Sequence, residues 1–268
     1  MTDSVLIVGA GQAASQLIAS LRQDGFAGAI TLVGDEPYIP YQRPPLSKAF
    51  LAGELARERL FIKPEEFYAE AKVASYLNTR AGAVDRARKT VKLANGQELS
   101  YTTLAITTGS RVRQLPLPGA DLPGCYYLRG IADVELLQGK LKAGNRIAII
   151  GAGYIGLEVA AVAAKHKLKV TVLEALPRVM ARAACPELSA FYEDVHRKAG
   201  VDIRCNTKLE AIEKNGTALT VKTSGGSVET DFVLIGIGIV PNVELAADAG
   251  LKIDNGILTD ERCRTDDP

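Results

Sequence analysis

The stretch VLIVGAGQAA, residues 5–14, predicts a buried strand, a tight turn and the start of a helix. An apolar run ends at Gly9, and apolar residues at helical spacing follow the turn. Gly9 suits the sharp bend, Gly11 lets a ligand approach the backbone, and small Ala14 allows helix and strand to pack closely. The free N–H groups and positive dipole end of such a helix favour a pyrophosphate. This stretch therefore predicts a dinucleotide site.

The same pattern returns almost letter for letter at IAIIGAGYIGLEVA, residues 147–160. Its glycines are Gly151, Gly153 and Gly156. One such motif alone is a weak signal, but a strand, a glycine turn and a helix in that order strengthen it. Two units in one chain predict two dinucleotides and electron transfer between them.

The composition is typical of a soluble globular protein large enough for two domains. The chain has 268 residues, of which 47% are apolar and 24% charged. A formal net charge of +1 gives no electrostatic case for binding nucleic acid or an anionic membrane. No apolar run approaches a membrane span, and no targeting segment fits the N-terminus, so we expect a cytoplasmic protein.

The four cysteines are scattered along the chain, and none belongs to a C-x-x-C pair. This spacing disfavours a redox-active dithiol, a zinc site and an iron–sulfur site. The chain has only two histidines, so no metal site is predicted. We expect four reduced thiols: Cys125, Cys185, Cys205 and Cys263.

An acidic residue follows each glycine turn at the distance in sequence at which a carboxylate binds an adenosine ribose. In the first unit AITLVGDE, residues 29–36, ends in two acids, of which we select Asp35; the alternative is that both begin a polar loop. In the second unit the strand KVTVLEA reaches Glu174. An acid there favours NADH over NADPH, although Arg178, four residues on, weakens that preference.

The segment YIPYQRPPLSKAFLAG, residues 38–53, is stiffened by prolines, which deny regular structure until about Leu46. Ser47 is then expected to cap a short helix. Arg43 and Lys48 place cations near the first nucleotide site. Basic pairs usually lie on a solvated surface, but the stiff setting favours a positioned role here.

Small residues end two later strands, which fits close passage of a ligand. The first strand ends at Thr107, Thr108 and Gly109, and the second lies in VLIGIGIVPN, residues 233–242. Between the fingerprints, the proline-rich segment 110–124 predicts a domain boundary.

An amphipathic helix is predicted over residues 186–200. Pro186 suits its first turn and Gly200 its end. Its apolar face would comprise Leu188, Tyr192, Val195 and Ala199.

These motifs together resemble the FAD-dependent, NADH-using ferredoxin reductases that serve bacterial oxygenases. That group includes the reductase components of aromatic-ring dioxygenases and the putidaredoxin-reductase type. The similarity covers the whole chain, and the PPLSK block is its most specific part. The matching stretches are GAGQAA, PYQRPPLSKAFLAG, TTG, YYLR at 126–129, GAGYIGLEVAA, LEALPRVMAR and IGIGIVPN.

The resemblance implies an α/β fold with two Rossmann-like dinucleotide-binding domains of the three-layer, glutathione-reductase-like flavoprotein type. It implies an FAD-binding domain over residues 1–112 and 243–268, and an NAD-binding domain over 113–242. Members of the family continue past this chain's end into a Gly-Asp strand that contacts FAD and a smaller interface domain. We therefore expect a truncated chain that lacks the interface domain.

The resemblance also implies the site residues. Lys48 and Glu158 would act beside the reacting rings, with Glu158 facing the nicotinamide and paired with Lys48. Asp35 and Glu174 would each bind a ribose, Ala13 the pyrophosphate and Ala81 the adenine end. The residues expected to bind FAD are Gly9, Gly11, Gln12, Ala13, Asp35, Arg43, Lys48, Ala81, Thr108, Gly109 and Arg129. Those expected to bind NADH are Gly151, Gly153, Tyr154, Ile155, Gly156, Glu174, Gly236 and Gly238.

The implied function is transfer of a hydride from NADH to FAD and of single electrons to a [2Fe–2S] ferredoxin. Hydride transfer needs neither a nucleophile nor a general base, and the chain shows no such constellation. Three alternatives remain open: a rubredoxin or nitrite reductase component of the same fold, a non-catalytic NADH/FAD sensor of the apoptosis-inducing-factor type, and a protein with two NAD sites and no flavin.

Overall fold

The computed structural model describes residues 3–267, which form two compact units. The first unit comprises the residues up to Gln42, Arg57–Arg111 and the residues from Val240 onward. The second comprises Arg43–Ala56 and Val112–Ile239. The segment 43–56, expected in the first domain, therefore groups with the second unit, because its hydrogen bonds and ion pairs go there.

The first unit is built on a parallel sheet with strand order β3-β2-β1-β7, as in half of a doubly wound fold. Helices α1 and α2 pack on one face, where Ile18 and Tyr68 meet the strand residues Val5 and Ile7. The parallel strands are β1 (Ser4–Val8), β2 (Ala29–Val33), β3 (Val73–Tyr76) and β7 (Thr103–Ile106), and the helices are α1 (Gln12–Gln23), α2 (Glu65–Glu70), α6 (Glu244–Asp248) and the 3₁₀ turn η2 (Arg57–Leu60).

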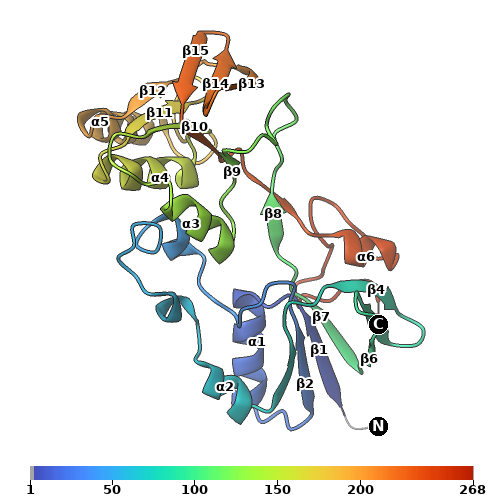
Figure 1. Cartoon of the computed structure of the whole chain (residues 1–268). Coiled ribbons are helices and arrows are strands. Elements are labelled where there is room, and N and C mark those ends of the chain that lie inside the picture. Colours follow the sequence, from blue (N-terminus) through green and yellow to red (C-terminus); the bar gives the residue numbers. More distant parts are fainter. Residues whose placement is uncertain (1–2, 268) are drawn as a thin grey trace. The chain divides into compact units, whose positions relative to one another are not determined.

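An antiparallel meander covers the other face of this sheet (Figure 1). Alternate residues of β1, Leu6 and Val8, face it and pack with Val91 and Leu93. Asn95 and Gly96 form the turn between the last two strands, where Gly96 has φ +87°. The meander consists of β4 (Ala81–Asp85), β5 (Thr90–Leu93) and β6 (Glu98–Ser100).

The second unit repeats these three layers around a parallel sheet of order β12-β11-β10-β16-β9. Ala148 and Ile150 of β10 pack against a meander that contributes Val221, and α4 contacts β10 and β11. The sheet holds β9 (Cys125–Tyr126), β10 (Arg146–Ile150), β11 (Lys169–Leu173), β12 (Asp202–Arg204) and β16 (Phe232–Ile235); the meander holds β13 (Leu209–Asn215), β14 (Ala218–Thr223) and β15 (Gly226–Thr230); the helices are η1 (Pro44–Ser47), α3 (Ile131–Gln138), α4 (Tyr154–Lys165) and α5 (Pro186–Lys198).

Two of the four boundaries between the units fall in short paired strands, β8 (Ser110–Val112) and β17 (Ile239–Pro241). The first lies at the start of the predicted boundary segment 110–124. Within residues 3–267, no helix combines the length and apolar character needed to cross a membrane. The expected α/β architecture of two three-layer dinucleotide-binding units is therefore confirmed.

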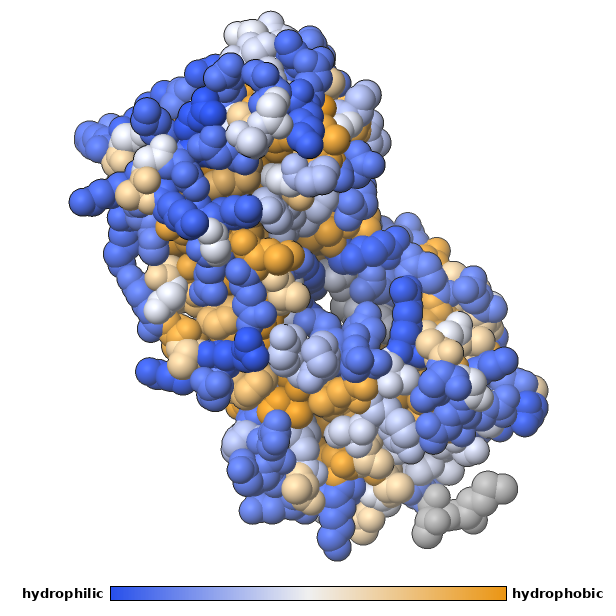
Figure 2. Space-filling view, in the orientation of Figure 1, coloured by the Kyte–Doolittle hydropathy of each residue, from blue (hydrophilic) through white to orange (hydrophobic). Residues whose placement is uncertain are grey.

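Helix α5 exposes most of the apolar face that the sequence predicted. The exposed fractions of Leu188 and Val195 are 43% and 45%, whereas Ser189 and His196 are buried. The helix thus packs through the neighbouring stripe, which carries Ser189 and His196. Hydrophilic residues predominate around this end of the second unit (Figure 2), which leaves the apolar stripe flanked by charge.

The proline segment also differs from its prediction. Pro44 and Pro45 open the 3₁₀ helix η1 instead of preventing helical structure, because a first turn needs no N–H donor. Ser47 ends this helix and caps nothing; its hydroxyl reaches α4.

Candidate functional site

The first glycine turn has the geometry that a nucleotide requires. Gly9 has φ +112°, and a Cβ there would lie 2.2 Å from the carbonyl oxygen of Thr107 at the end of β7. A Cβ on Gly11, by contrast, would meet nothing within 4 Å. The first glycine is therefore required by the fold, and the second leaves open space beside the helix N-terminus.

Helix α1 begins at this open space with no side chain on its N-terminal donors. Gly11 is its N-cap, and its first turn contains no acidic residue. Gln12 and Ala13 are exposed, and Ala14 is buried against the sheet. The first-turn N–H groups and the dipole can therefore bind an anion such as a pyrophosphate.

The second glycine turn repeats this arrangement. Gly151 has φ +100°, and its Cβ would lie 2.4 Å from the carbonyl oxygen of Gly236. Gly153 caps α4 beside open space, again with no acid in the first turn. Tyr154 is 57% exposed at the first turn, and Ile155 is half-buried. The predicted NADH residues around this turn are thus brought together.

Glu174 is held against the second turn by two backbone donors. Its Oε2 accepts a hydrogen bond from the Ala152 N–H at 2.8 Å, and its Oε1 accepts one from the Leu176 N–H at 2.9 Å. Since Ala152 is fully buried, this carboxylate also satisfies a donor that water does not reach. The arrangement fixes an acid where a ribose hydroxyl would bind.

The first unit places its acid one residue later. Gly34 stands at the position equivalent to Glu174, and a Cβ there would lie 2.5 Å from the Cβ of Ala10. Asp35 follows and is exposed, and the Glu36 carboxylate accepts the Tyr41 hydroxyl at 2.5 Å. The choice of Asp35 for the ribose stays a prediction.

A second repeated feature escaped the sequence analysis. The edge strands β3 and β12 are each followed by a turn with an asparagine in the left-handed region, Asn78 at φ +51° and Asn206 at φ +55°. The following threonines, Thr79 and Thr207, donate their N–H groups to Gly34 and Glu174. The shared Asn-Thr pair was the available signal. These turns close the edge of each candidate ribose site.

The Arg178 side chain forms hydrogen bonds with the loop that follows Glu174. Its guanidinium donates to the carbonyl oxygens of Ala181 and Ala184 and to the hydroxyl of Ser189, at 2.6 to 3.1 Å. These bonds organise the loop and use both Nη1 donors and one Nη2 donor of the guanidinium. They hold the side chain within its own loop, which reduces the weight that Arg178 carries against a preference for NADH.

The predicted strand-end residues lie at the expected sheet edges. Thr108 donates its hydroxyl to the Asn242 carbonyl oxygen at 2.7 Å, beside Gly109 with φ +64°. In the second unit, Gly236 lies against the first glycine and Gly238 has φ +108°. Ala81 begins β4 in the first unit and is half-buried.

Three residues expected to border FAD, Arg43, Lys48 and Arg129, lie in the second unit. Arg43 donates to the Arg129 carbonyl oxygen at 2.7 Å. Lys48 forms an ion pair with Glu158 of α4 at 2.7 Å, so the expected pair is present. Their roles beside a flavin stay predictions.

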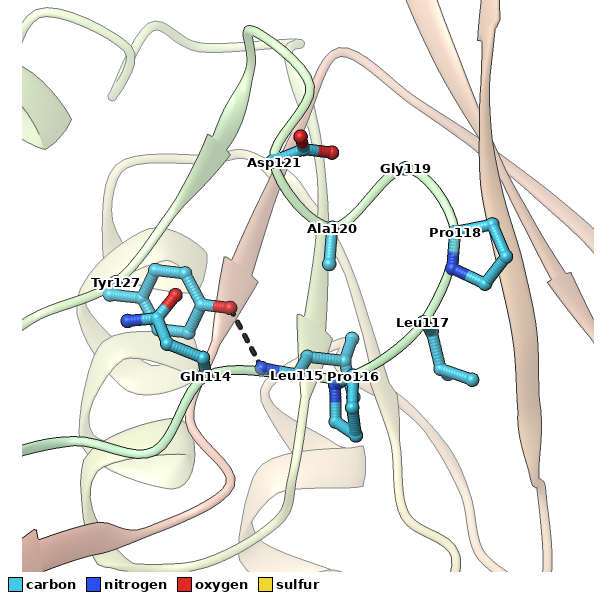
Figure 3. A pocket seen from close by; sticks show the side chains of 9 residues that line it. All are labelled: Gln114, Leu115, Pro116, Leu117, Pro118, Gly119, Ala120, Asp121 and Tyr127. Atoms are coloured by element: carbon cyan, nitrogen blue, oxygen red, sulfur yellow. Dashed lines mark hydrogen bonds between the residues drawn. The ribbon is translucent and has the colours of Figure 1, made fainter.

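A shallow hollow lies elsewhere in the second unit, in the loop 114–121 (Figure 3). It has a volume of about 320 Å³, and the Leu115 N–H donates to the Tyr127 hydroxyl across it. Cys125 lies behind this loop; burial, with the nearby charge of Asp121, raises the pKa of its thiol to about 11. An inert thiol and a hollow away from the glycine turns indicate packing and not chemistry.

Comparison with known proteins places this arrangement in a family. Residues 3–268 match the family model of the pyridine nucleotide-disulphide oxidoreductases. The chain is 44% identical to rhodocoxin reductase of Rhodococcus erythropolis over 98% of its own length and 62% of that protein. It is 40% identical to rubredoxin-NAD(+) reductase of Pseudomonas putida over 98% of its length and 69% of that protein.

A solved structure shares the fold closely. The covalent complex of putidaredoxin reductase with putidaredoxin matches with a TM-score of 0.94 and 42% identity, over 99% of this chain and 66% of that chain. The chain thus spans about two thirds of the length of the relatives it matches. The four cysteines are free thiols in this structure. With its two glycine turns and its sheet order, the chain belongs to the pyridine nucleotide-disulphide oxidoreductase family.

Proposed function

We propose that this protein is an NADH-dependent flavoprotein reductase that takes electrons from NADH through FAD to a [2Fe–2S] ferredoxin serving an oxygenase. The net reaction converts one NADH and two oxidised ferredoxins into NAD⁺, two reduced ferredoxins and one proton. The observation that carries the proposal is the duplicated dinucleotide site, with an uncapped helix N-terminus and an open glycine position in each unit.

The residues of each unit fit a dinucleotide. Gly11 and Gly153 leave room for a pyrophosphate at α1 and α4, and the two helices offer N–H donors without competing carboxylates. We assign FAD to the first unit and NADH to the second, following the similarity to ferredoxin reductases. Glu174 and the committed Arg178 support NADH over NADPH.

FAD, when bound, supplies a hydride acceptor that can release its electrons singly. The chain's own residues bind and orient the two nucleotides. Lys48 would place a positive charge beside the flavin, where it favours the more negative reduced form. Glu158 would hold that ammonium in place through the ion pair. No proton moves to or from either side chain in this scheme.

The partner is proposed from the relatives. A solved relative is a covalent complex of putidaredoxin reductase with putidaredoxin, and another relative is named rhodocoxin reductase, which supports an iron–sulfur ferredoxin as acceptor. The 40% identity to a rubredoxin-NAD(+) reductase supports rubredoxin as the second candidate. We further propose a bacterial cytoplasmic location, supported by the bacterial sources of these relatives and by four free thiols.

The test is anaerobic spectroscopy followed by turnover. The purified protein, incubated with FAD and then freed of excess, should show flavin absorption that bleaches on addition of NADH. Oxidised [2Fe–2S] ferredoxin should then be reduced faster than rubredoxin, and NADPH should replace NADH poorly. Absence of bound flavin after reconstitution would overturn the flavoprotein assignment. Bleaching without transfer to either carrier would overturn the reductase assignment and favour a sensor.

A further inference from the structure

Ser47 reaches the carboxylate that pairs with Lys48. Its side chain is buried, with an exposed fraction of 4%, and its hydroxyl donates to Oε2 of Glu158 at 2.5 Å. The ammonium of Lys48 contacts the same oxygen at 2.7 Å. Two neighbouring residues of one segment therefore converge on a single carboxylate oxygen.

The backbone explains this convergence. Lys48 leaves the 3₁₀ helix η1 with φ −127° and ψ −115°, which turns its side chain away from the helical direction. Its ammonium also donates to the Pro44 carbonyl oxygen at 3.1 Å, across one turn. The two prolines fix the start of that turn. The donors of Ser47 and Lys48 are thus aimed before any ligand binds.

The segment that carries them is anchored at several points. Gln138 of α3 donates to the Phe50 carbonyl oxygen at 2.5 Å, and Lys165 of α4 pairs with Glu54. Glu158 and Lys165 lie seven residues apart on α4, on the same face. The segment therefore follows α4, and Ser47 is held in register with Glu158.

The three side chains differ in how well solvent screens them. Lys48 is 51% exposed and Glu158 is 28% exposed, and an ion pair of this kind is weak and mobile when alone. A buried hydroxyl that donates to a carboxylate makes a stronger and more directional bond. The ion pair alone would therefore fix the carboxylate poorly, whereas the Ser47 bond restricts its rotamer.

We infer that Ser47 is a positioning residue that holds Glu158 so that Glu158 in turn holds the Lys48 ammonium for the redox site. This inference rests on the proposed function. Ser47 keeps its proton, forms no covalent bond and need not touch either cofactor. Its contribution passes through Glu158, so it should vanish when that carboxylate is removed.

The experiment is a double-mutant cycle on the FAD-loaded protein, read by the rate of flavin bleaching with NADH in a rapid-mixing instrument. Ser47→Ala should slow the limiting rate about tenfold and change the NADH concentration for half-maximal rate by less than about twofold. Ser47→Thr, which keeps the hydroxyl, should restore most of the rate. In a Glu158→Gln background, Ser47→Ala should add less than about a twofold effect.

Thr230→Val is the matched control. Thr230 is fully buried and donates to the carbonyl oxygens of Arg146 and Phe232 at the opposite end of the sheet, so its loss should lower stability and leave the limiting rate unchanged. If Ser47→Ala fails to fold, Ser47→Cys, of similar size and with a weaker donor, carries the same comparison.

The outcomes separate this inference from the proposed function. If the wild-type protein binds FAD but NADH does not bleach it, the proposed function fails and the cycle is read instead from NADH titration of the flavin spectrum. If wild type reacts but Ser47→Ala is as fast, or is equally harmful with and without the Glu158 carboxylate, the positioning role is overturned.

Discussion

The two nucleotide-binding units share one backbone plan but differ at the positions that set how closely helix and strand approach. Each has a parallel sheet with a meander on one face. A glycine turn follows β1 in the first unit and β10 in the second, and an Asn-Thr turn follows β3 and β12. Ala14 in the first unit corresponds to Gly156 in the second. A Cβ on Gly156 would lie 2.0 Å from the Gly151 carbonyl oxygen, whereas the first unit accommodates a methyl group. The same backbone plan therefore accepts different side chains at this position.

A second difference concerns the acids. The Glu174 carboxylate accepts a hydrogen bond from its own glycine turn. In the first unit the equivalent residue is Gly34, which leaves room for Ala10. The acid follows one residue later, as the exposed Asp35. The acid of the second unit thus stabilises the fold, apart from its predicted role in binding a ribose. The acid of the first unit has no such structural role, since no hydrogen bond or ion pair of Asp35 occurs within residues 3–267.

The largest effect is expected at the closest helix–strand contact. Gly156→Ala should lower the free energy of unfolding by about 1–3 kcal/mol, because α4 must move away from β10. Ala14→Gly should cost about 1–2 kcal/mol, through lower helix propensity and the loss of a buried methyl group. Urea titrations followed by circular dichroism measure both. Gly153→Ala, with open space at its Cβ, is the control; an equal loss there would contradict the steric explanation.

The next largest difference in unfolding free energy is expected between alanine variants of the two acids. Glu174→Ala leaves the buried Ala152 N–H without its acceptor and should cost about 1–2 kcal/mol in the absence of nucleotide. Asp35→Ala should stay within about 0.5 kcal/mol of wild type. The same urea titrations decide between them. Equal losses for the two variants would mean that the acids play one structural role.

Helices α2 and α5, which precede β3 and β12, should differ in how they make the stability of the fold depend on pH. Tyr68 of α2 and His196 of α5 are buried at equivalent positions, and burial lowers the pKa of His196 below its ordinary 6.5. The imidazole of His196 therefore binds a proton less readily in the folded state than in the unfolded state. Stability is fully present above pH 6.5 and falls as pH drops from there toward the lowered pKa, by at most about 1.4 kcal/mol per pH unit.

His196→Gln should remove this part of the pH dependence. Unfolding free energies of wild type and variant at pH 7.5 and 5.5 provide the comparison. His166→Gln, at the end of α4, serves as the control and should keep the wild-type difference. A His196→Gln protein that loses as much stability as wild type on acidification would contradict the assignment.

The smallest effect concerns coenzyme choice. Arg178→Met should change the ratio of NADPH-dependent to NADH-dependent activity by less than about twofold, because its donors already serve the loop. Activity with both coenzymes should fall together as the loop loosens. A steady-state assay with each coenzyme gives the ratio. A selective loss of NADPH activity would show that Arg178 binds the 2′-phosphate after all.

Much of the two sites could be predicted because it depends on short-range sterics. Gly9 and Gly151 must adopt positive φ against a neighbouring strand, and only glycine does so without strain. Glu174 follows a parallel strand, so its place at the carboxyl edge of the sheet is fixed by chain direction. Lys48 and Glu158 were paired through a family resemblance, and the structure shows the ion pair.

Other features depended on segments far apart in the chain. Ser47 was expected to cap a helix, but its acceptor lies 111 residues away on α4. The apolar face of α5 is exposed because the sheet beside it, and not the helix pattern, decides which stripe is covered.

The sequence by itself determined the two glycine turns, the parallel strands that lead into them and the acid at Glu174, because the order of apolar, glycine and acidic residues within short stretches marks these features. Tertiary structure decided that residues 43–56 join the second unit, that Arg178 serves its own loop and that Ser47 supports Glu158. The physical reason is that a donor's partner is whichever acceptor the folded chain brings within about 3 Å, and no local pattern encodes that choice.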